Sequence, residues 1–136
     1  MKKLLVGLTV LTSIGFLTLV IKNLRANGTP LVTAVKNQDV SQVKKLITAN
    51  AKVNEQDTEG NTALMYAVQE PKSTEIVEEL IKAKADTTLK NNNGLNALML
   101  ASKTIRNTAE TVKKLITAGA QAHEQDNQRN TALIYA

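Results

Sequence analysis

The feature that most constrains the fold is a frame of apolar residues that recurs through residues 29–136. Its leucines are Leu31, Leu64, Leu98 and Leu133, spaced by 33, 34 and 35 residues, and an alanine follows each of them three positions later. A Leu-Ile pair also returns at 46–47, 80–81 and 115–116. One unit of this length cannot bury its apolar face alone, whereas stacked units can, so the period predicts a solenoid of repeated units.

Each unit carries two short helical patterns. In the first unit Leu31 and Ala34 form one pattern, and Val43 with the pair at 46–47 forms the other, both with the i, i+3, i+4 spacing of a helix face. Thr29-Pro30 supplies an N-cap and a proline suited to the first turn of the first helix. Capping boxes at 39–42 and 107–110 predict where the second helix of a unit begins.

The second helix of each unit is expected to end in a left-handed residue. Asn50, Lys84 and Gly119 occupy this position in the motifs ANA, AKA and AGA. Glycine adopts the left-handed conformation freely, asparagine tolerates it, and lysine adopts it at a cost. We therefore predict that Lys84 has a positive φ angle and is strained.

The repeats resemble the ankyrin family. The motif T-P-L-H-x-A of that family matches TPLVTA at 29–34 and, less closely, TALMYA, NALMLA and TALIYA. Its turn D-x-x-G matches 57–60 and 91–94 and degrades at 126–129, where Arg129 replaces glycine. The motif histidine is absent from every repeat. The resemblance implies an all-α ankyrin-repeat solenoid with three full repeats (29–56, 57–90, 91–125) and a partial fourth (126–136).

An N-terminal apolar helix is expected to precede the repeats, within residues 1–28. Residues 4–21 carry no charge, and 18 helical residues at about 1.5 Å rise are long enough to span a bilayer core. We expect an uncleaved, single-pass signal anchor in the membrane, with the repeats on the extracytoplasmic (periplasmic) side. The alternative is cleavage after Ala26, which would release a secreted or periplasmic protein.

Composition argues against several classes of function. The chain has no cysteine and a single histidine, His123. It therefore lacks the residues that form the common metal clusters and the common nucleophile–base pairs of enzymes. No phosphate-binding glycine motif occurs. Four of the 17 basic residues flank the apolar stretch, which leaves 13 basic against 12 acidic residues and two tyrosines in the repeats. We expect no enzyme activity, cofactor, metal, nucleic acid or small-molecule substrate.

Matched charged triplets mark the second helices. They read Val-Lys-Lys at 43–45, Val-Glu-Glu at 77–79 and Val-Lys-Lys at 112–114. Stacking would bring opposite charges side by side. Two interpretations stay open: a charged docking face, or a ladder of exposed ion pairs that each contribute roughly 0–1 kcal/mol.

The ankyrin resemblance implies a function in protein binding, through the tips of the turns and the inner helix face. Leu95 is apolar at a turn position where the neighbouring repeats have asparagine, so it either anchors a partner or packs locally. A second hypothesis is an inhibitor or immunity protein that neutralises a toxin or an exported enzyme. Carried over position by position, the predicted protein-binding residues are Thr58, Glu59, Asn61, Gln69, Glu70, Asn92, Asn93, Leu95, Lys103, Thr104, Asn127, Gln128 and Asn130.

The fourth unit ends after the start of its first helix, at Ala136. Solenoids normally carry a polar capping unit, and a helix this short does not persist alone. We therefore expect the native protein to continue by at least a second helix.

Overall fold

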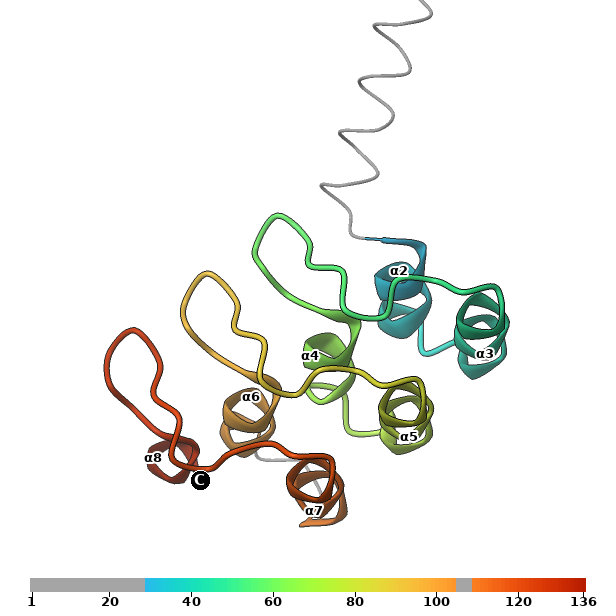
Figure 1. Cartoon of the computed structure of the whole chain (residues 1–136). Coiled ribbons are helices and arrows are strands. Elements are labelled where there is room, and N and C mark those ends of the chain that lie inside the picture. The colour runs from blue at the N-terminus through green and yellow to red at the C-terminus, as the bar shows by residue number, and fades with distance from the viewer. Residues whose placement is uncertain (1–28, 105–108) are drawn as a thin grey trace, which may run out of the picture.

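The structure is a computed structural model that describes residues 29–104 and 109–136. This part of the chain contains helices and turns and no strand, which confirms the predicted all-α fold. The helices form two rows that lie side by side (Figure 1). The inner row is α2 (Pro30–Lys36), α4 (Ala63–Ala67), α6 (Ala97–Lys103) and α8 (Ala132–Tyr135), and the outer row is α3 (Val40–Thr48), α5 (Thr74–Lys82) and α7 (Ala109–Thr117).

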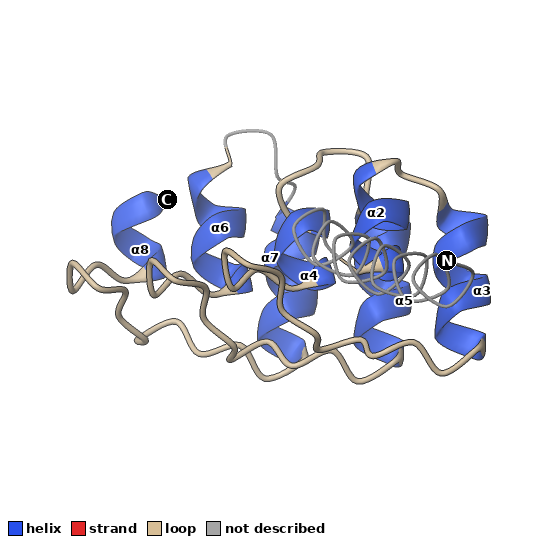
Figure 2. Ribbon diagram, turned by 90° about the horizontal axis from the view of Figure 1, so that it is seen from above, coloured by secondary structure: helices blue, strands red, loops and turns tan. Residues whose placement is uncertain are grey.

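Long turns project beyond the inner row and lie next to one another along the array (Figure 1). Figure 2 shows the same helices from above, with the inter-repeat turns gathered at one end of the helices. The tips of these three turns comprise residues 57–61, 91–95 and 126–130. This arrangement gives the array one surface made of turns and inner helices and another made of outer helices.

Side-chain caps explain where the inner helices begin. Thr29, Thr62 and Asn96 accept hydrogen bonds from the backbone N–H groups three residues later, at 3.2, 3.3 and 2.9 Å. Each cap satisfies one of the N–H groups that lack a partner at a helix start. Asp39 caps α3 in the same way through the N–H of Gln42, at 2.9 Å, as predicted. The box at 107–110 begins outside the described residues.

The recurring apolar frame forms the core. Leu31, Leu64 and Leu98 are 1–2% exposed, and Val43, Leu80 and Leu115 of the outer helices are fully buried. Met65 and Met99, which replace the motif histidine, are also buried, so this position is apolar in the interior repeats. Leu133 departs from the frame because α8 has no described outer helix beside it, and the expectation of a following helix stays a prediction.

Three predicted left-handed positions are confirmed. The φ angles are 59° at Asn50, 65° at Lys84 and 101° at Gly119. Gln38 and Arg129 also have positive φ angles, of 55° and 66°, and these were not predicted. A non-glycine residue in this region is strained because its Cβ approaches the following carbonyl oxygen.

The predicted membrane anchor at residues 4–21 lies outside the described residues. Among the helices that the structure describes, none has both the length and the apolar character that a bilayer crossing requires.

Candidate protein-binding surface

The three turns share one internal geometry, set by the residue at their start. In the second repeat, Oδ1 of Asp57 accepts hydrogen bonds from the backbone N–H of Glu59 at 3.0 Å and of Asn61 at 2.9 Å. Asn91 and Asp126 make the same two bonds in the next turns. A short side chain that bonds its own backbone is a common way to fix a tight turn. The tips therefore have a defined conformation before any partner binds.

Asparagine side chains join the turns to one another. Asn92 donates its backbone N–H to the carbonyl oxygen of Glu59 and its Nδ2 to that of Thr58, each at 3.0 Å. Asn127 donates in the same way to the carbonyls of Asn93 and Asn92, at 3.3 and 3.0 Å. These bonds turn three separate loops into one stacked surface.

The stacking explains why two of the three turns contain glycine. Gly60 and Gly94 have φ angles of 76° and 77°. A Cβ on Gly94 would lie 2.6 Å from the backbone nitrogen of Asn127, and one on Gly60 would lie 2.9 Å from that of Asn92. Arg129 holds the same position with φ 66°, where no described turn stacks upon it. The position requires glycine where another turn follows.

Tyrosine hydroxyls close the base of the second and fourth turns. The Tyr66 hydroxyl donates to Oδ2 of Asp57 at 2.6 Å, and the Tyr135 hydroxyl donates to Oδ2 of Asp126. Burial and the bond to Asp57 raise the pKa of Tyr66 to about 12. The bond from Tyr135, with the backbone N–H groups of the turn, lowers the pKa of Asp126. Both tyrosines therefore stay protonated donors at neutral pH.

A lysine from the preceding inner helix lies near each tyrosine ring. The Lys36 ammonium is 4.1 Å from the centroid of the Tyr66 ring, and that of Lys103 is 5.7 Å from the centroid of the Tyr135 ring. Such a contact contributes about 0.5–1 kcal/mol at an exposed site. We call Lys36–Tyr66–Asp57 and Lys103–Tyr135–Asp126 the Lys–Tyr–Asp units.

The third turn replaces all three members together. Gln69, Leu100 and Asn91 stand where the units have lysine, tyrosine and aspartate. Without a tyrosine hydroxyl, Asn91 uses its own Nδ2, which donates to Oδ1 of Asn61 in the previous turn at 2.9 Å. The turn thus keeps its fold without a charge at this position.

Comparison with known proteins decides the family. The profile described as ankyrin repeats, in three copies, matches residues 8–91 and 69–136. The chain belongs to the ankyrin repeat family. The match begins within the segment predicted as a membrane anchor, so it overlaps the predicted boundary at residue 28.

Two curated relatives match part of the chain. An ankyrin repeat protein of fowlpox virus (strain NVSL) is 35% identical over 90 residues, which is 66% of this chain and 20% of the viral protein. The human 2-5A-dependent ribonuclease is 35% identical over 72 residues, which is 53% of this chain and 10% of the ribonuclease. This chain matches only a tenth to a fifth of the length of these relatives.

Most of the predicted binding residues lie on the surface of turns and inner helices. Thr58, Glu59, Gln69, Glu70, Asn93, Lys103 and Gln128 are exposed, and Thr104 is half-buried. Asn92 and Asn127 are exposed as well, but their side-chain amides join the turns. Asn61 is buried and Asn130 half-buried, and both donate within the turn networks. Asn61 and Asn130 therefore support the surface from within.

Leu95 is half-buried, and its role as an anchor for a partner stays a prediction. It packs against the core, and it also lines a shallow pocket of about 220 Å³ beside α6 and α8. The other residues that line this inner pocket are Asn93, Lys103, Asp126, Asn127, Gln128 and Tyr135. The pocket thus brings together several predicted residues from adjacent repeats.

The structure adds Lys36, Tyr66 and Tyr135, which the sequence argument did not select. A signal was present in the sequence. The fifth position of the motifs TALMYA, NALMLA and TALIYA is tyrosine, leucine and tyrosine, and the turn before each motif begins with aspartate, asparagine and aspartate in the same order. Changes that occur together in the same repeats indicate side chains that contact one another.

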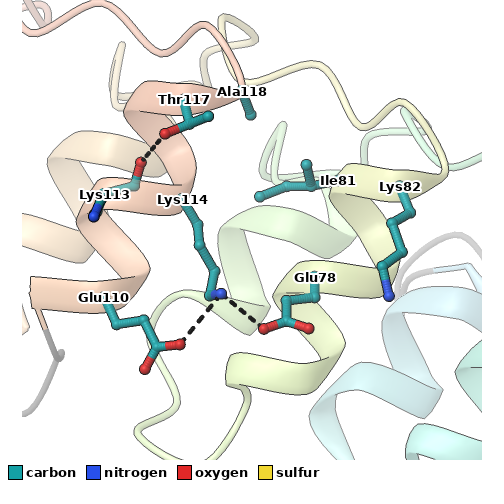
Figure 3. A pocket seen from close by; sticks show the side chains of 8 residues that line it. All are labelled: Glu78, Ile81, Lys82, Glu110, Lys113, Lys114, Thr117 and Ala118. Carbon is teal, nitrogen blue, oxygen red and sulfur yellow. Dashed lines mark hydrogen bonds and ion pairs between the residues drawn. The ribbon is translucent and has the colours of Figure 1, made fainter.

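The outer helices carry ion pairs, both between neighbouring helices and within one helix. Lys44 pairs with Glu75 at 2.8 Å, and Lys114 pairs with Glu78 at 2.8 Å and with Glu110 at 3.2 Å (Figure 3). These pairs support the ladder interpretation of the charged triplets, although Lys44 selects Glu75 rather than a triplet glutamate. A pocket of about 570 Å³ lies beside Lys114, with Ile81 and Ala118 in its wall. Its carboxylates are already bonded to Lys114.

The described residues contain no group of three metal-ligating side chains close enough to hold an ion, and His123 is exposed.

Proposed function

We propose that this protein binds a partner protein along the surface formed by the turn tips and the ends of the inner helices. Ankyrin repeats are protein–protein interaction modules, and the proposal locates the binding surface within this one. One observation carries it: exposed side chains from three repeats lie along one stacked surface whose backbone is fixed by hydrogen bonds between turns. A surface ordered in advance loses less conformational entropy on binding.

The acidic side chains of the two surfaces support the same assignment. All four glutamates of the outer helices form ion pairs: Glu75, Glu78, Glu79 and Glu110. Glu59, at a turn tip, forms none with any residue in the described part of the chain, whereas lysines without an ion pair occur on both surfaces: Lys103 on an inner helix, and Lys45 and Lys113 on outer helices. Charges without an internal counterpart are free to complement a partner.

Site-specific photocrosslinking tests this assignment. A benzophenone amino acid replaces Asn93 at a turn tip or, as the matched control, Lys113 on an outer helix; both side chains are exposed. After illumination in native cells, mass spectrometry should identify a protein attached at position 93 and absent at 113. Capture of the same protein only from position 113 would place the interface on the outer helices and contradict the proposal.

We further propose that residues 4–21 tether the repeats to a membrane. The support is the uncharged 18-residue run, long enough for a bilayer core. Carbonate extraction of native membranes, followed by N-terminal sequencing, should recover the intact chain in the pellet. A soluble chain that begins near Asn27 would contradict the tether, and so would a soluble intact chain, which would agree with a repeat that begins near residue 8.

A further inference from the structure

The three turn tips differ in charge in a regular order. The residues after the first position are Thr58-Glu59-Gly60, then Asn92-Asn93-Gly94, then Asn127-Gln128-Arg129. The second repeat thus presents an acid, the third presents amides only, and the fourth presents a cation. Glu59 and Arg129 are both exposed.

Neither charged tip is neutralised by another residue that the structure describes. Glu59 accepts one hydrogen bond, from Nδ2 of Asn61 at 3.2 Å, and an amide donor leaves its charge in place. Arg129 forms no ion pair with an acidic residue, and all 12 acidic residues lie in the described part of the chain. The order acid, neutral, cation is therefore visible to a partner.

The remaining charges nearby preserve this order. A Lys–Tyr–Asp unit with one cation and one carboxylate stands at each end, so the two units leave the difference in charge between the ends unchanged. Glu70 is followed two residues later by Lys72 in the same exposed loop, and these two also balance. The difference between the ends of the surface thus comes from Glu59 and Arg129.

The inner pocket adds an apolar contact and a cation next to the fourth turn. Leu95 forms part of its wall, and Lys103 lies in it without an ion pair to any described carboxylate. Asp126 also lines this pocket, but the residue is only 8% exposed and its carboxylate accepts four hydrogen bonds from the turn and from Tyr135. A partner side chain therefore meets the ammonium of Lys103 rather than a free carboxylate.

We propose that the partner presents a segment with the opposite order of charge. A lysine or arginine lies on Glu59, an apolar side chain packs on Leu95, and an aspartate or glutamate lies on Lys103 and Arg129. This inference rests on the proposed function and adds the chemistry of the partner to it. Complementary charges fix the direction in which the segment lies and speed its association, while like charges oppose the reverse direction.

A phage library of random 12-residue peptides, selected on the full chain, tests the inference. Wild-type protein should enrich peptides that carry a basic residue at one end, an acidic residue at the other and an apolar residue between them. Glu59→Lys should remove the enrichment of basic residues, and Arg129→Glu should reduce that of acidic residues. The selected wild-type peptides should bind each variant about tenfold more weakly, as expected for one lost charge pair near the surface.

Two control variants match these changes in net charge. Glu55→Lys and Lys113→Glu alter exposed residues away from the turn tips and should leave the selected peptides unchanged. Circular dichroism melts establish that all four variants fold.

The outcomes separate this inference from the proposed function. If selected peptides crosslink to position 93 but show no charge order, or if Glu59→Lys and Arg129→Glu select the wild-type peptides, the inference is overturned and the proposed function stands. If the selected peptides crosslink to the outer helices instead, both are overturned.

Discussion

The inner helices of the third and fourth repeats begin with similar sequences, NALMLA at 96–101 and TALIYA at 131–136. These two segments nevertheless have different surroundings. Leu98 and Met99 are 2% and 1% exposed, whereas Leu133 and Ile134 are 82% and 65% exposed. Asn96 caps its helix through the N–H of Met99, while Thr131 makes no side-chain cap.

The difference shows that burial in this molecule depends on the neighbouring unit as much as on the motif. An interior inner helix packs against its own outer helix and against inner helices on both sides, whereas α8 lies beside α6 alone within the described residues. Stability in such arrays is approximately the sum of a unit's own terms and those of its interfaces. Equivalent substitutions in the two repeats should therefore have unequal effects.

Core truncation should give the largest contrast. Leu98→Ala removes a buried side chain from between two rows of helices and should lower the free energy of unfolding by about 2–5 kcal/mol. Leu133→Ala removes a side chain that is mostly exposed and should change it by less than about 0.5 kcal/mol. Urea unfolding measures both, and equal losses would mean that Leu133 is buried in solution.

The turn glycine should distinguish the repeats next. Gly94→Ala places a Cβ against the backbone of Asn127 at a positive φ angle and should cost about 1–3 kcal/mol. Arg129→Gly relieves the same backbone conformation without a described turn above it and should add up to about 1 kcal/mol. Thermal melts should thus shift in opposite directions, and a shared direction would contradict the stacking geometry.

The left-handed helix end offers a comparison between the second and third repeats. Lys84 has a φ angle of 65° where Gly119 stands in the next repeat. Lys84→Gly should therefore stabilise the protein by up to about 1 kcal/mol, because glycine adopts this backbone without strain. A melt without change, or with a loss of stability, would contradict a left-handed Lys84 in solution.

The charge at the start of the turn should produce the smallest effect, visible as a pH dependence. The pKa of Asp126 is lowered in the folded state, chiefly by the bond from Tyr135, so the carboxylate stabilises the fold fully above the unfolded pKa of about 4. This stabilisation is lost as the pH falls through the lower, folded pKa. Asp126→Asn copies Asn91 and has no carboxylate to protonate at this position. It should therefore lose less stability than wild type as the pH falls from about 5 to about 2, the range in which a carboxylate with a lowered pKa becomes protonated.

Urea unfolding at several pH values compares the two proteins, with Asp39→Asn as a control at an aspartate outside the turns. Parallel curves for wild type and Asp126→Asn would show that the turn carboxylate has the same pKa in both states.

Sequence reasoning anticipated the parts of the fold that follow from local and periodic rules. The two rows of helices follow from the apolar spacing, and the left-handed ends at Asn50, Lys84 and Gly119 follow from their place after each second helix. The alternation at 43–45, 77–79 and 112–114 predicted opposite charges on neighbouring outer helices. Each of these depends on the period alone.

The sequence pattern did not predict the individual side-chain contacts between neighbouring repeats. Nothing in the spacing indicates that Asn92 bonds the previous turn, or that Asn61 is buried while Thr58 is exposed. The pairing of Lys44 with Glu75 rather than with a triplet glutamate likewise depends on the offset between α3 and α5. Which side chains form a hydrogen bond or an ion pair depends on distances of a few ångströms between repeats. The spacing of residues in the sequence does not give these distances.

Hydrogen exchange of the native chain tests most directly the claim that each inner helix is stabilised by packing against neighbouring helices rather than by its own sequence motif. We predict slow exchange for the backbone amides of 99–103 in α6, at rates at least about 100-fold below those of 134–135 in α8. This ratio corresponds to a difference of roughly 2.7 kcal/mol in local stability. Equal protection of the two segments, despite the exposure of Leu133 and Ile134, would contradict it.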